Sequence, residues 1–79
     1  MNIRNLADRI YNGEEITFYT NEPDIFNDYK MTITKILPGT YDIKTCEIER
    51  ELMMTFETLI EFIKEFKPND YLSRKELED

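Results

Sequence analysis

The chain has 79 residues, with 17 Asp and Glu against 10 Lys and Arg, and its formal net charge is −7. This length predicts one domain with a small core, and five Tyr and five Phe argue against disorder. The acidic balance argues against direct binding to nucleic acid or to anionic lipid, because both need a basic patch. It favours a soluble protein with a cationic partner surface.

Residues 1–10 place charges inside an apolar pattern, which is typical of neither a signal peptide nor a membrane span. Cys46 is the one cysteine, so an internal disulfide cannot form. Such usage is typical of a reducing compartment. We therefore expect a cytoplasmic protein.

The first predicted element is a helix over residues 2–12. Asn2 is a suitable N-cap, and Asn12-Gly13 is a common helix stop. The apolar side chains that recur at spacings of three and four are Ile3, Leu6, Ala7 and Ile10.

Three strands are predicted next, over residues 14–20, 29–37 and 40–47, because β-branched and aromatic residues alternate with polar ones. Pro23 makes the segment between the first two strands a loop. The turn Leu37-Pro38-Gly39-Thr40 fits type II, in which Pro sets φ at the second position and Gly accepts a positive φ at the third.

A long amphipathic helix is predicted over residues 48–66, ending at Pro68. Its apolar stripe is Ile48, Leu52, Met53, Phe56, Leu59, Ile60, Ile63 and Phe66. Residues 69–79 form a polar C-terminal tail, in which Ser73 and Glu76 fit a capping box for a short final helix.

Together these elements predict an α+β fold of αβββα order, in a single domain over residues 1–68. A three-stranded antiparallel sheet would have the N-terminal helix and the long C-terminal helix packed on one face.

No catalytic constellation is evident in the sequence. The chain has no His and a single Ser, Ser73, which excludes Ser-His-Asp and Cys-His arrangements. Cys46, predicted in a strand, fits a small buried residue better than a nucleophile. Asp24, Asn27 and Asp28 lack the spacing and glycine of a calcium loop. We therefore expect no enzyme activity, no cofactor and no metal.

The acids gather in two groups, and both are candidates for partner binding. The first lies in a segment without Lys or Arg and comprises Glu14, Glu15, Glu22, Asp24 and Asp28. The second is a row spaced by four on the predicted helix and comprises Glu57, Glu61 and Glu65.

Two interpretations of the acids stay open. They are a solvated surface, or they are a charged rim around an apolar anchor, which Ile25 and Phe26 would supply unless Phe26 tucks into the core. Carboxylates on a rigid face can also take the place of DNA phosphates in a basic groove.

The start of the chain resembles a family of small acidic phage proteins, the Listeria-type anti-CRISPR inhibitors of Cas9. The shared positions are Met1-Asn2-Ile3, Leu6, Ile10, Asn12 and the acid Glu14. A strand at 41–43 leading into an acidic amphipathic helix that ends at Phe66-Lys67 is similar in kind. The chain departs from the family in its second hairpin turn, which is acidic and Asn-rich there, and in its mixed tail with Arg74 and Lys75.

The resemblance implies a protein of the host bacterial cytosol that occupies the groove where Cas9 reads the PAM duplex. Glu14 stands where that family has a functional acid, and Gly39 stands in the matching turn.

We therefore expect an inhibitor that blocks a nucleic-acid-binding effector such as Cas9 by acidic DNA mimicry. The alternative is a small homodimeric structural or regulatory module, which pairs through an exposed strand edge or through Met54 and Phe62.

Overall fold

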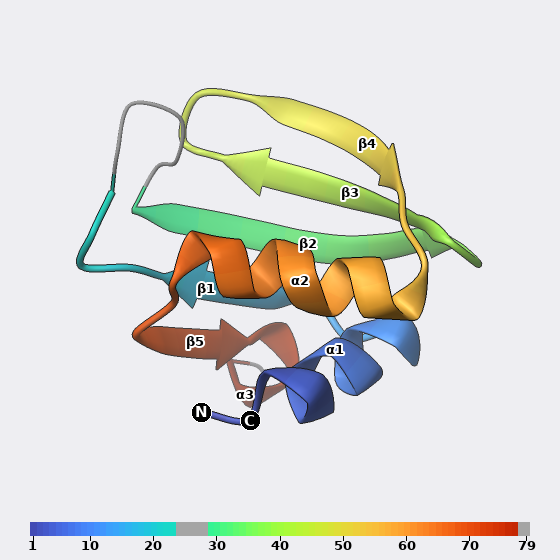
Figure 1. The fold of residues 1–79 in the computed structure, drawn as a ribbon, viewed down its shortest axis with the longest axis horizontal. Coiled ribbons are helices and arrows are strands. Elements are labelled where there is room, and N and C mark those ends of the chain that lie inside the picture. The colour runs from blue at the N-terminus through green and yellow to red at the C-terminus, as the bar shows by residue number, and fades with distance from the viewer. Residues whose placement is uncertain (24–28, 78–79) are drawn as a thin grey trace.

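The computed structural model describes residues 1–23 and 29–77, and its elements are shown in Figure 1. None of the helices in these residues has the length and apolar content that crossing a membrane requires. The elements are α1 Ile3–Tyr11, β1 Ile16–Tyr19, β2 Lys30–Leu37, β3 Thr40–Thr45, β4 Glu49–Met53, α2 Phe56–Phe66, β5 Asp70–Ser73 and α3 Arg74–Leu77.

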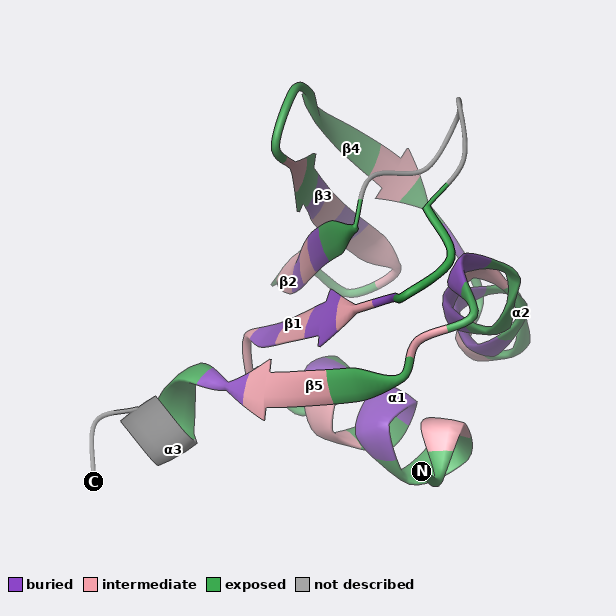
Figure 2. Ribbon diagram, turned by 90° about the vertical axis from the view of Figure 1, so that its left-hand side faces the viewer, coloured by how far each residue is buried: buried purple, intermediate pink, exposed green. Residues whose placement is uncertain are grey.

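The five strands form one antiparallel sheet in the order β4-β3-β2-β1-β5. Helices α1 and α2 pack on one face of this sheet, and they leave the other face, the outer face, open (Figures 1 and 2). The predicted α+β class is confirmed. The predicted number of strands is wrong, because β4 and β5 extend the expected three-stranded sheet at its two edges.

The core lies between the sheet and these two helices. Ile16, Ile33 and Ile43 stand side by side on the inward face of β1, β2 and β3, and all three are buried. Side chains alternate between the faces along each strand, so their neighbours on the outer face are polar or charged. Full burial of such a side chain stabilises the fold by about 1.5–3 kcal/mol, so the inward row fixes the strand register.

Residues 48–66 do not form the single helix that their apolar spacing predicts. Strand β4 occupies 49–53, and α2 begins only at Phe56. Thr55 marks the boundary, because its side chain accepts a hydrogen bond from the backbone N–H of Thr58 at 3.1 Å and caps α2. The residues before this cap pair along the edge of β3 instead. The predicted end of the helix before Pro68 is confirmed.

The segment predicted as a polar tail contributes a strand to the sheet. Strand β5 pairs with β1, and the backbone N–H of Asn69 donates to the carbonyl of Tyr19 at 2.7 Å. Ser73 is fully buried at the end of β5. Its Oγ accepts a hydrogen bond from the backbone N–H of Lys75 at 3.2 Å, as a residue capping α3 would. The Glu76 side chain of the predicted capping box lies outside the described part.

Most of the local signals from the sequence are matched in the structure. The Asn2 side chain caps α1 by accepting from the N–H of Asn5 at 3.0 Å. Gly39 has a φ of +82°, which a type II turn requires at its third position. Cys46 is an exception, because it follows the end of β3 and is exposed rather than buried.

Candidate protein-binding site

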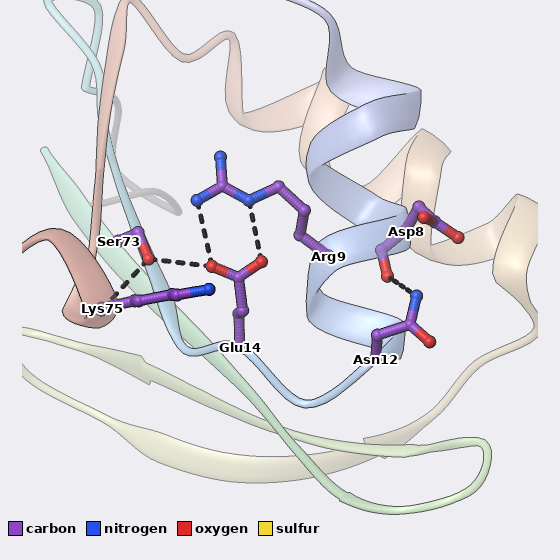
Figure 3. A network of polar contacts seen from close by, with 6 residues as sticks. All are labelled: Asp8, Arg9, Asn12, Glu14, Ser73 and Lys75. Carbon is purple, nitrogen blue, oxygen red and sulfur yellow. Dashed lines mark hydrogen bonds and ion pairs between the residues drawn. The ribbon is translucent and has the colours of Figure 1, made fainter.

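Glu14 lies in a polar network that joins α1, the start of β1 and β5 (Figure 3). Arg9 holds its carboxylate with two hydrogen bonds, Nε to Oε2 at 2.8 Å and Nη2 to Oε1 at 3.0 Å. The buried Ser73 hydroxyl donates to Oε1 at 3.1 Å. The hydrogen bonds from Arg9 lower the pKa of Glu14 most; burial opposes this, and Ser73 and Lys75 add to it. Glu14 is therefore ionised, and its negative charge is compensated by Arg9 of the same chain.

Glu15 points to the outer face, as strand alternation requires, and it is engaged as well. Its carboxylate accepts from Thr34 Oγ1 at 3.0 Å and pairs with Arg74 Nη1 at 3.3 Å. The backbone N–H of Arg74 also donates to the Glu15 carbonyl at 3.0 Å. The first two acids of the predicted acidic segment therefore hold the C-terminal residues against β1.

The other acids of that segment have different positions. Glu22 is exposed, and its backbone N–H donates to Thr20 Oγ1 at 3.1 Å. Asp24 and Asp28 lie outside the described residues, together with the two residues predicted as an apolar anchor, Ile25 and Phe26. Glu14 and Glu15 point to opposite faces of the sheet, so the structure does not bring them together as one acidic surface.

The predicted acidic row lies on the exposed side of α2. Glu57 pairs with Arg4 at 3.3 Å, and Glu61 pairs with Lys64 at 3.7 Å. Both pairs are highly exposed, so they are weak and screened by salt. Glu65 is exposed further along the helix. Because α2 packs on the covered side of the sheet (Figure 2), this row faces away from the outer face.

A third acidic group, which the sequence analysis missed, lies on the outer face beside the β2–β3 turn. Asp42 on β3 is directly opposite Glu51 on β4. In the next row towards the turn, Thr40 lies between Leu37 on β2 and Met53 on β4. We call this group the hairpin corner; its members are Leu37, Gly39, Thr40, Asp42, Glu51 and Met53.

The hairpin corner combines charge with exposed apolar surface. Leu37 is 62% exposed and Met53 is 87% exposed, and the two flank Thr40 in the row next to the Asp42–Glu51 pair. Neither Asp42 nor Glu51 forms an ion pair with a residue of the described chain. An apolar centre beside charged groups is the usual composition of a protein interface.

Gly39 shapes this corner, as its position in the turn suggests. Its positive φ reverses the chain between β2 and β3, and its carbonyl accepts from the backbone N–H of Met54 at 2.9 Å. Met54 itself is buried, and Phe62 packs partly buried against the core. Met54 is therefore not available as the exposed contact that the homodimer hypothesis assigns to it.

A signal for the hairpin corner is present in the sequence. Glu49, Glu51 and Met53 alternate with Arg50 and Leu52, which is the two-residue period of a strand. The helical spacing of the neighbouring apolar residues concealed it. With β4 assigned as a strand, its outward positions carry two acids and an exposed methionine.

Comparison with known proteins finds no family model that matches the chain, no curated protein that matches it and no solved structure that matches the fold.

Proposed function

We propose that this chain is a phage-type inhibitor, a binding protein that inserts its hairpin corner into the basic groove of a nucleic-acid-binding bacterial protein. One observation carries the proposal. Asp42 and Glu51 stand directly opposite each other, beside the exposed Leu37 and Met53. The net charge of −7 supports a cationic partner.

The facing carboxylates favour binding to cations. Like charges directly opposite on neighbouring strands destabilise a sheet by an amount of order tenths of a kcal/mol. An arginine or lysine from a partner placed between Asp42 and Glu51 removes this repulsion. Binding therefore regains free energy that the unbound protein lacks, and the rigid strands hold the two carboxylates in place.

The apolar side chains supply the affinity that exposed charges alone do not. Burial of a side chain such as Leu37 or Met53 contributes about 1.5–3 kcal/mol before the costs of association. The carboxylates then steer the approach and set the orientation. In a groove built for duplex phosphates, Asp42, Glu49 and Glu51 take the phosphate positions, which is DNA mimicry.

The resemblance at the N-terminus makes guide-loaded Cas9 the first target to test. We expect the chain to inhibit cleavage of target DNA, and we expect the inhibition to weaken as the salt concentration rises. Full cleavage at a large excess of the chain, with no detectable binding to Cas9, would remove Cas9 as the partner. The wider proposal of a basic groove is tested separately by affinity capture from a bacterial lysate.

A homodimer is the second candidate, and the position of β4 favours it. β4 ends the sheet, so its outer edge has no strand partner in the described chain and can pair with a second copy. Light scattering after size exclusion separates the two proposals. A dimer that persists at high salt supports the homodimer, whereas a monomer supports the inhibitor.

A further inference from the structure

The outer face has a depression beyond the hairpin corner, towards the start of β2. Its volume is about 420 Å³, which is within the range of small-molecule sites. Thr17 and Thr32 lie opposite each other across β1 and β2 within it, and Lys44 lies opposite Thr32 on β3. Tyr19, Lys30 and Leu72 also line the depression.

The depression brings together two lysines, Lys30 and Lys44, in an acidic chain. Lys30 and Lys44 are exposed, and neither forms an ion pair with a residue that the structure describes. Glu49 lies opposite Lys44 without pairing with it. The acid that lines the depression, Glu15, is already engaged by Thr34 and Arg74. Neither ammonium group is therefore held in an ion pair within the described surface.

Beside the lysines, the two threonines offer a hydrogen-bond donor. Thr17 Oγ1 and Thr32 Oγ1 are 2.8 Å apart, and their hydrogen bond uses only one of the two hydroxyl protons. The other proton has no acceptor in the described part of the chain. One hydroxyl and two ammonium groups gathered on neighbouring strands suit an anion with several oxygens, and lysine is a common ligand of phosphate.

An aromatic ring and an aliphatic side chain border the same depression. Tyr19 lies opposite Lys30, and Leu72 lies opposite Thr17 on the β5 side. Tyr19 is partly exposed, so a planar group can stack on its ring. We propose that this depression binds a small organic phosphate that carries an aromatic ring, namely a mononucleotide. The charge of −7 repels a longer polyanion, which distinguishes this site from one for nucleic acid.

The proposal is tested by following backbone amide resonances during titration with adenosine monophosphate. We expect the shifts to concentrate at Thr17, Tyr19, Thr32 and Lys44. Parallel titrations use inorganic phosphate, adenosine and a single-stranded oligonucleotide. Inorganic phosphate and adenosine each lack one half of the recognised group, so both should bind more weakly than adenosine monophosphate.

Variants separate the contributions of charge and stacking. The double variant Lys30→Gln/Lys44→Gln should weaken binding of adenosine monophosphate about tenfold, and Tyr19→Leu should weaken it about fivefold or more. The control Lys64→Gln removes one positive charge from α2, away from the depression, and should leave the affinity unchanged.

Four results would each overturn the proposal. They are the absence of shifts at the depression, equal affinity for adenosine and adenosine monophosphate, an equal loss in the Lys64→Gln control, and tighter binding of the oligonucleotide.

Discussion

Asp42 and Glu51 face each other across the β3–β4 ladder, and neither has an ion-pair partner in the described chain. By contrast, Glu14 and Glu15, which the sequence singled out, are held by Arg9 and Arg74. The acids that hold the fold together are therefore distinct from those that stand without compensation. The second kind has more electrostatic free energy to gain from a cationic partner.

Replacing one acid of the facing pair should stabilise the protein. Glu51→Lys converts a repulsive cross-strand pair into an attractive one, so the free energy of unfolding should rise by about 0.5 kcal/mol. Urea denaturation measures this change, and Glu51→Gln should give a smaller increase. A loss of stability in both variants would show that the two carboxylates do not repel each other.

The Arg9–Glu14 pair should matter more for stability than the exposed pairs. Glu14→Gln removes the charge that Arg9 and Ser73 bind, and we expect a loss of about 1–2 kcal/mol. Glu57→Gln, which breaks the exposed pair with Arg4, should cost less than about 0.5 kcal/mol. Urea denaturation compares the two variants. Equal losses would contradict the structural role of Glu14.

The same network predicts that the stability of the fold depends on pH. The pKa of Glu14 is lower in the folded chain than in the unfolded one, where it is about 4.3. The stability that ionised Glu14 contributes is therefore complete above its unfolded pKa. It is lost as the pH falls through its pKa in the folded chain. The stability difference between the wild type and Glu14→Gln should shrink below about pH 4. A difference that stays constant from neutral pH into this range would contradict the prediction.

The cap of α2 should contribute measurably to the fold. Thr55→Ala removes the side chain that accepts from the N–H of Thr58, which should lower the free energy of unfolding by about 1 kcal/mol. Thr55→Ser keeps the hydroxyl and serves as the control. If both variants lost the same stability, the cap would not be the cause.

The sequence was sufficient for the elements whose signals are local. The helix at the N-terminus has its cap at Asn2, and the β2–β3 turn has its glycine at Gly39, so both were predictable. The boundary at Thr55 was not, because the apolar spacing on its two sides happens to continue the helical period. A strand followed by a helix can have the apolar pattern of one longer helix. This happens when the inward residue of the strand, here Leu52, lies at a helical spacing from the apolar residues of the helix.

Strand β5 and the pairing of the acids depend on contacts that are distant in the chain. Ser73 was expected in a polar tail because its neighbours Arg74 and Lys75 are charged. These residues are instead held by Glu14 and Glu15, which are 59 positions away in the sequence. Counting charges along the sequence therefore overestimated how many acids of the first group lack an ion-pair partner. It also overlooked the hairpin corner.

The most direct test of the hairpin corner is affinity capture from a bacterial lysate with three baits at low and high salt. The baits are the wild type, Glu51→Lys and Asp8→Lys; the last makes the same charge change at an exposed position on α1. We predict that the wild type and Asp8→Lys capture the same nucleic-acid-binding protein at low salt and release it at high salt, while Glu51→Lys does not capture it. Equal capture by all three baits, or capture that high salt leaves unchanged, would contradict the account.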